Sequence, residues 1–213
     1  MRLFSLFSAI FCASSFLAQE IWMTPNSGQW DARIQYSVDL ALGKIFLQKD
    51  GMCFMLTDFM AHGDGDGHEH SHEHDHGGEK AQRIHVIHQR FVGSKTEVET
   101  QNNNPSLDLK NYFIGKDSSK WKSNIHSFNE VHYKGFYDNI DLIYKGENGQ
   151  LSYNFLIAPG ADVSQIKWNF DGAHKVFIKN GVLIIANRFG TIEQSAPIAY
   201  ELLETGQKTK IKV

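Results

Sequence analysis

The chain has 213 residues, a formal net charge of −3 and 41% hydrophobic residues. This length favours one domain over a large multidomain enzyme, and the composition is that of a folded protein rather than a disordered chain. The small net charge provides no basic surface of the kind that binds nucleic acid. Eighteen Gly and fifteen Phe beside only four Pro favour β structure over a helical bundle.

Residues 1–18 have the pattern of a secretory signal peptide. Arg2 is followed by an apolar run interrupted only by Ser, and polar residues begin at Gln19. The run is too short to span a bilayer, so we predict that it is removed on export, after Ala18 or at a second site offered by Ala13 and Ser15. The alternative is that this segment forms a buried N-terminal strand or helix. Export places the protein outside the cell or on its surface, with the periplasm as an alternative destination.

Removal of the signal peptide leaves a single cysteine, Cys53, which excludes an internal disulfide. Its apolar neighbours, Met52 and Phe54, predict a buried and unreactive thiol. No second run of eighteen or more apolar residues follows, so no membrane span is expected in the exported chain.

Alternating apolar and polar residues predict short strands along the rest of the chain, and no stretch keeps a helical period for long. The clearest strand is 33–40, and the pattern recurs in 151–157 and 166–170. Only 117–123 tolerates a helix, of one turn. We therefore predict an all-β fold over residues 19–213, an antiparallel β-sandwich or distorted barrel of about 10–12 short strands.

Three tight turns are predicted between these strands. Asp50-Gly51 and Asn180-Gly181 tolerate positive φ and so favour two-residue hairpins. A third hairpin is expected across 146–149.

Exposed aromatic side chains would point to a ligand. Tyr112 and Phe113 precede Gly115, and Trp121 follows it; this cluster either seals the open end of the sandwich, which we favour, or forms a ligand shelf. A carbohydrate or peptide binder requires Trp30, Trp121 or Trp168 on one concave face.

Several motifs resemble the N-terminal all-β domain of unknown function in large secreted surface proteins of gliding bacteria. They are, in chain order, NSGQWD (26–31), YFIGKD (112–117) before Trp121, YDNIDLIY (137–144), GQLSYNF (149–155), APGAD (158–162) and EQSAP (193–197) before Tyr200. The resemblance covers nearly all of the predicted mature chain. It implies an association with gliding motility and type IX secretion, with repeats or immunoglobulin-like modules downstream, and it supplies no catalytic residues. Residues 210–213 read as an unfinished strand, so we expect the N-terminal part of a longer protein.

A histidine-rich segment, 62–78, is predicted to be a flexible insert between strands. Its candidate metal ligands are His62, His68, His70, His72, His74 and His76. Imidazole binds Zn²⁺, Ni²⁺ and Cu²⁺. Alternate residues of an extended chain lie roughly 6.5 Å apart, so the segment must bend to hold one ion at about 2.1 Å, and its Gly residues permit this. Ordering it costs about 1–2 kcal/mol per residue, which predicts modest affinity.

Two interpretations of this segment remain open. The first is a disordered low-complexity loop with incidental metal affinity, and we favour it as the biological role. The second is a metal buffer or sensor loop. The first requires no cofactor, and loosely bound Zn, Ni or Cu is compatible with both.

The sequence contains no nucleophile elbow, Walker loop, dinucleotide fingerprint or zinc-protease helix, so we do not expect an enzyme. Asp138 and Asp141 are interpreted as solvated turn carboxylates. We expect a noncatalytic N-terminal domain of an exported bacterial protein, with an interaction or architectural role. Expected partners are downstream domains of the same protein, surface proteins or glycans. The alternatives are a metal-binding protein and a carbohydrate- or peptide-binding domain.

The histidine-rich segment makes one measurable prediction. Calorimetric titration with Zn²⁺ or Ni²⁺ is expected to give binding heat at pH 7.5 and none at pH 5, because imidazoles with an ordinary pKa of about 6.5 are protonated there. A chain lacking 62–78 is the control. Absence of heat at pH 7.5 contradicts the prediction.

Overall fold

The computed structural model describes residues 3–11, 20–41, 43–58, 83–203 and 207–211, with side chains described from Glu20 onward. About two thirds of these residues lie in β-strands and very few in helical turns, which confirms the all-β prediction. The strands are β1 (Leu3–Phe11), β2 (Met23–Pro25), β3 (Ile34–Leu40), β4 (Gly43–Gln48), β5 (Gly51–Thr57), β6 (Ile84–Phe91), β7 (Glu99–Tyr112), β8 (Lys122–Tyr137), β9 (Ile140–Glu147), β10 (Gln150–Ile157), β11 (Trp168–Asp171), β12 (Lys175–Lys179), β13 (Val182–Asn187), β14 (Gly190–Gln194), β15 (Ile198–Leu202) and β16 (Lys208–Ile211). Two 3₁₀ turns are also present, η2 (Ser118–Lys120) and η3 (Val163–Gln165).

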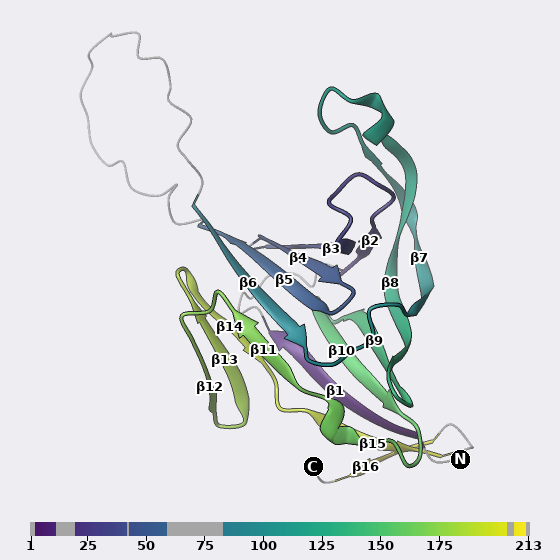
Figure 1. Ribbon diagram of the computed structural model, residues 1–213, viewed down its shortest axis with the longest axis vertical. Helices are drawn as coiled ribbons and strands as arrows, with labels where there is room; N and C mark the ends of the chain where they lie inside the picture. The colour runs from purple at the N-terminus through teal and green to yellow at the C-terminus, as the bar shows by residue number, and fades with distance from the viewer. Residues whose placement is uncertain (1–2, 12–19, 42, 59–82, 204–206, 212–213) are drawn as a thin grey trace, which may run out of the picture.

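The main sheet is antiparallel and curls into an incomplete barrel (Figure 1). Its strand order is β11-β6-β5-β4-β3-β2-β8-β9-β10-β1-β14-β13-β12. The two ends of this order, β11 and β12, are joined by only three residues, 172–174, yet no ladder connects them. The barrel therefore has an open seam between its two edge strands.

An aromatic cluster holds the curled sheet together. The ring of Phe91 on β6 lies 5.4 Å from that of Phe136, 5.9 Å from Tyr153, 5.6 Å from Phe155 and 6.3 Å from Trp168, all in edge-to-face geometry. In the sheet, six strands separate β6 from β10, which carries two of these partners. Contact between them therefore crosses the interior, and edge-to-face pairs add about 0.5–1.5 kcal/mol each to their burial.

The alternating patterns in the sequence identify the buried faces correctly. On β10, Leu151, Tyr153, Phe155 and Ile157 are all buried, as their two-residue spacing predicts. On β3, Tyr36 and Val38 are buried in the same way.

The predicted hairpins are present. Asn180 and Gly181 both have positive φ and link β12 to β13 as expected. The β9–β10 turn narrows to Asn148-Gly149, which also have positive φ. At β4–β5 the turn lies one residue earlier than predicted, because Gln48 pairs with Gly51. Gly51 is needed for another reason: a Cβ there would lie 2.0 Å from the carbonyl oxygen of Gln89 on β6.

Strands β7 and β8 form a long hairpin, which we call the arm, and its tip extends beyond the rest of the sheet (Figure 1). The tip contains η2, where the sequence predicts a single helical turn. It also contains Phe113 and Trp121, whose rings pack against each other. Phe113 is 64% exposed and Trp121 is 44% exposed. The interpretation that these rings seal the end of a sandwich is therefore wrong.

The segment predicted to be a signal peptide contributes strand β1. It runs antiparallel to β10, with Phe4 opposite Ile157 and Ile10 opposite Leu151. Its other edge pairs with β15 and, near Phe11, with β14. The structure thus describes where this segment lies in the uncleaved chain, and its removal on export stays a prediction.

The rings packed around Phe91 predict that two Phe→Ala substitutions, one inside the barrel and one on the arm, differ strongly in their effect on the free energy of unfolding. Phe91→Ala is expected to lower the free energy of unfolding by about 3–5 kcal/mol, because it leaves a cavity between opposite walls of the sheet. Phe113→Ala, at the exposed arm tip, is the matched control and is expected to cost less than about 1 kcal/mol. Urea unfolding measures both, and equal effects would contradict this account of the fold.

Candidate functional site

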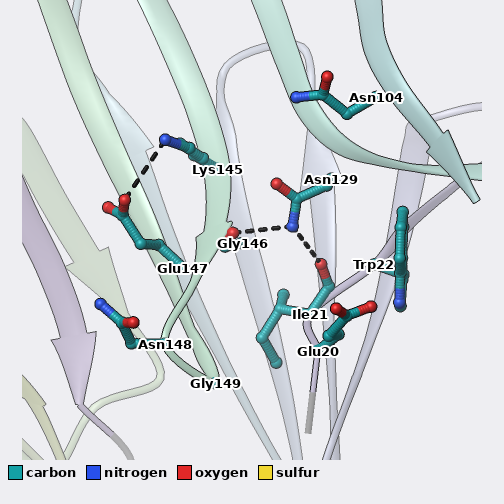
Figure 2. A pocket seen from close by; sticks show the side chains of 10 residues that line it. All are labelled: Glu20, Ile21, Trp22, Asn104, Asn129, Lys145, Gly146, Glu147, Asn148 and Gly149. Atoms are coloured by element: carbon teal, nitrogen blue, oxygen red, sulfur yellow. Dashed lines mark hydrogen bonds and ion pairs between the residues drawn. The ribbon is translucent and has the colours of Figure 1, made fainter. Parts of the chain in front are cut away.

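Two hollows in the described surface are candidate sites. The first is a polar hollow of about 510 Å³ between the start of β2 and the β9–β10 turn, with Trp22, Asn104 and Asn129 among its lining residues (Figure 2). Some of its polar groups are occupied by bonds within the chain. The Asn129 amide donates to the backbone carbonyl oxygens of Ile21, at 3.2 Å, and Gly146, at 2.7 Å.

The same hollow also contains an ion pair. Lys145 Nζ lies 3.4 Å from Glu147 Oε1, and Figure 2 shows this pair on the opposite side of Asn129 from Trp22. Both side chains are well exposed, so the pair contributes little stability. The Asn129 bonds beside this hollow hold the chain at Ile21, just before β2 begins.

The second hollow lies along the open seam of the barrel, and we call it the seam groove. It has a volume of about 480 Å³ and is lined by Tyr153, Phe155, Trp168, Phe170, Val176, Ile178, Gly181, Leu183, Gln194, Ser195 and Pro197. These residues come from β10, β11, β12, β13 and β14 and from the segment after β14. None of them is Asp, Glu, His, Lys, Arg or Cys, and most are aromatic or aliphatic, so the lining suits the binding of apolar groups.

A buried hydrogen-bonded relay lies at the inner wall of the seam groove. The Tyr153 hydroxyl donates to Gln194 Oε1 at 2.9 Å, and Gln194 Nε2 donates to Gln89 Oε1 at 2.6 Å. Gln194 and Gln89 are 1% and 0% exposed, so water cannot replace the hydrogen bond between their amides. The relay ties β14 to β6 and β10 across the interior, and it thereby fixes the position of one groove wall.

The outer wall of the groove is the edge strand β12. All five of its residues are exposed, and Ile178 is 74% exposed. Val176 and Ile178 line the groove, so Lys175, Phe177 and Lys179 occupy the other face of the strand. Lys175 Nζ lies 5.1 Å from the centroid of the Phe177 ring. Among the described strands only β13 pairs with β12, which leaves one backbone edge of β12 without a strand.

The predicted metal ligands, His62, His68, His70, His72, His74 and His76, lie outside the described residues. Within the described ranges, no three His, Cys, Asp or Glu side chains come together as a metal site.

His85, on β6, has a structural role. Its Nδ1 accepts from the Arg188 N–H at 2.9 Å, and its Nε2 lies 2.7 Å from the Gly172 carbonyl oxygen. These contacts require the neutral tautomer protonated at Nε2. They attach the 172–174 link and the end of β13 to β6.

Asp138 and Asp141, both predicted to be solvated turn carboxylates, lie in different surroundings. Asp138 is exposed in a turn and pairs with Lys95 at 2.7 Å, as a solvated carboxylate does. Asp141 lies in β9, so its interpretation as a turn carboxylate is wrong. Its Oδ1 accepts from the Gly135 N–H at 2.6 Å, and its Oδ2 lies 3.1 Å from His132 Nε2. This carboxylate fixes the bend of β8 before the β8–β9 turn.

The three tryptophans proposed as a shared platform lie in different places. Trp168 lines the seam groove. Trp30 packs against Tyr112 at 5.1 Å, and Trp121 packs against Phe113 at the arm tip. Only Trp168 therefore remains a candidate for the groove.

Cys53 is buried, as predicted. Burial raises the pKa of its thiol, which disfavours the reactive thiolate.

One known protein family covers the strands from β2 to β16. Residues 23–213 match the model of a domain of unknown function, DUF7948. The chain belongs to the DUF7948 family. The match begins at Met23, the first residue of β2, so β1 precedes the DUF7948 region. No curated protein and no solved structure matches the chain significantly.

The described part of this DUF7948 chain contains no helix with the length and apolar character needed to cross a membrane. The sequence did not indicate the seam groove, because its lining is assembled from five strands. The one available signal was the alternation of Trp168 and Phe170, which places both on one face of β11.

The buried relay predicts a cost for removing one hydroxyl. Tyr153→Phe is expected to lower the free energy of unfolding by about 1–2 kcal/mol, because Gln194 Oε1 loses a buried donor. Tyr200→Phe, at a half-buried site on β15, is the control, with an expected change below about 0.5 kcal/mol. Urea unfolding of both variants checks this, and an unchanged Tyr153→Phe protein would contradict the relay.

Proposed function

We propose that this DUF7948 protein is an exported, noncatalytic interaction domain that binds an extended polypeptide segment at the seam groove. The observation that carries the proposal is the combination of an apolar groove with a free strand edge beside it. The signal-peptide pattern supports export, and the resemblance to surface proteins of gliding bacteria supports a cell-surface or type IX secreted setting.

The chemistry of the groove favours binding over reaction. Its polar lining groups include Gln194, whose amide is engaged in the buried relay, and its other walls are aromatic or aliphatic. Such a lining buries apolar side chains, at roughly 25 cal/mol per Å² of apolar surface. Its two hydroxyl side chains, Tyr153 and Ser195, have no His, Asp, Glu, Lys or Cys beside them in the lining that could act as a base.

The edge of β12 indicates what kind of ligand fits. An added strand would bond to the free backbone edge of β12 and place alternate side chains in the groove. The intervening side chains would lie beside Lys175 and Lys179 on the other face, where acidic residues are favoured. Lysines also discourage uncontrolled edge pairing, so they select against neutral or basic strands. We therefore propose an extended partner segment that alternates acidic and apolar residues.

Metal binding by the histidine-rich segment is a second candidate function. It is supported by the His-x-His spacing of 68–76 and is independent of the groove. Glycan binding is less well supported, since the three tryptophans do not share one face.

Peptide binding tests the proposed function. The probe is a fluorescein-labelled nonapeptide that alternates Glu with Val or Phe, and the readout is fluorescence anisotropy. We expect saturable binding, and Ile178→Asp is expected to weaken it at least about tenfold, because a carboxylate then faces the apolar groove.

The controls separate groove binding from general stickiness. Ile114→Asp places the same charge on the exposed arm tip and is expected to leave the affinity unchanged. A peptide with Lys in place of Glu is expected to bind more weakly, because it faces Lys175 and Lys179. Absence of saturable binding, or equal loss in both variants, would overturn the proposal.

A further inference from the structure

The place of β1 in the sheet has an unusual topological role. Among the described strands, β1 alone joins β10, on one side, to β14 and β15, on the other, by backbone pairing. Without a strand in this place, β12–β16 have no ladder to the rest of the sheet. Figure 1 shows β1 beside β10, with β14 and β15 on its other side.

The residues around this place determine what can occupy it. Seven consecutive residues of β1 are in register with β10. Every second one lies opposite a buried side chain of β10, from Leu151 to Ile157, each at most 5% exposed. Of the three intervening positions, two lie opposite Asn154 and Leu156, which are only partly buried, and the third lies opposite Ser152, which is buried. The place therefore accepts an extended strand with an apolar residue at every second position.

Two independent observations separate β1 itself from the domain. The DUF7948 match begins at Met23, after β1. Residues 1–18 also have the pattern of a signal peptide, so export would empty this place. An emptied place would leave one edge of β10 and the facing edge of β15 unpaired within the interior of the sheet, which is costly.

We infer that the place of β1 is a strand-acceptor site, filled in the exported protein by an extended strand donated by a second polypeptide. The inference rests on the export part of the proposed function. Every other described strand in residues 20–211 already has its own place in the sheet, so the occupant comes from outside them. Its chemistry is that of β1: uncharged in the ladder, antiparallel to β10 and apolar at three of the four positions opposite buried β10 residues.

Strand donation has a consequence for the seam groove. Strands β12, β13 and β14 supply Val176, Ile178, Leu183 and Gln194 to the groove, and the donated strand is their only ladder to β10. The donor strand therefore completes the groove, and the two binding events are coupled.

The test uses the processed chain, residues 19–213, with the full chain as reference. The probe is a synthetic peptide of residues 3–11 carrying terminal lysines for solubility. Hydrogen exchange followed by mass spectrometry reads the backbone amides of β10 and β15. We expect fast exchange in the processed chain and at least about tenfold slower exchange when the peptide is added.

Two peptide variants test the register. Leu6→Asp places a charge opposite buried Phe155 and is expected to weaken binding at least about tenfold. Ser5→Asp places the same charge opposite Leu156, which is only partly buried, and is expected to retain most of the affinity. Equal affinities for these two peptides would overturn the inference.

The remaining outcomes are also decisive. Protection of β10 and β15 without any peptide would show that they pair directly, and would overturn the inference. Exchange that stays fast after peptide addition would overturn it as well. If the processed chain is unfolded alone and folds with the peptide, strand donation is supported. Failure here is distinct from failure of the proposed function, because the seam-groove peptide can still bind the full chain in an Ile178-dependent manner.

Discussion

The contacts of Phe91 across the barrel interior are the interaction on which the rest of the structure depends. They join β6 to β8 and β10, strands that the sheet order keeps far from it, and also to its neighbour β11. A sheet of this length must curl to bury one face, and large rings span the wide interior that results. The curl brings β11 and β12 to the two sides of one short link, and the seam groove is the space left between them.

An interior of this width also has to accommodate polar groups. The rings of Tyr133 and Tyr144 lie 5.6 Å apart, and their buried hydroxyls have no hydrogen-bond partner among the described residues. Burial raises the pKa of both hydroxyls well above the usual value of about 10. The stability that this shift reflects is fully present below pH 10 and is lost as the pH rises further, when these groups must ionise. In the relay, by contrast, the Tyr153 hydroxyl and the Gln194 amide have partners, although Gln89 Nε2 has none among the described residues.

Local patterns predicted the elements, while the site depended on contacts that no local pattern contains. The alternation in β10 and the Asn-Gly turn at Asn180 are set by neighbouring residues, so the sequence indicated them correctly. The exposure of Phe113 was missed, because an aromatic pair beside a glycine looks the same in a core and on an arm. The seam groove was missed because its walls come from β10 to β14 and meet only after the sheet curls, and the curl is determined by Phe91 and its distant partners.

The same separation between local and distant information explains the place of β1. Its sequence meets two requirements at once, since an apolar, uncharged run of this length suits both a signal peptide and a buried strand. A strand needs only its backbone and alternate apolar residues to enter a ladder, so such a place has little selectivity for one particular sequence. The acceptor edges of β10 and β15 belong to the DUF7948 region, whereas β1 lies before it. The domain thus retains both walls of the place when the leader is removed, and a donated strand would restore the ladder that connects the seam groove to the core.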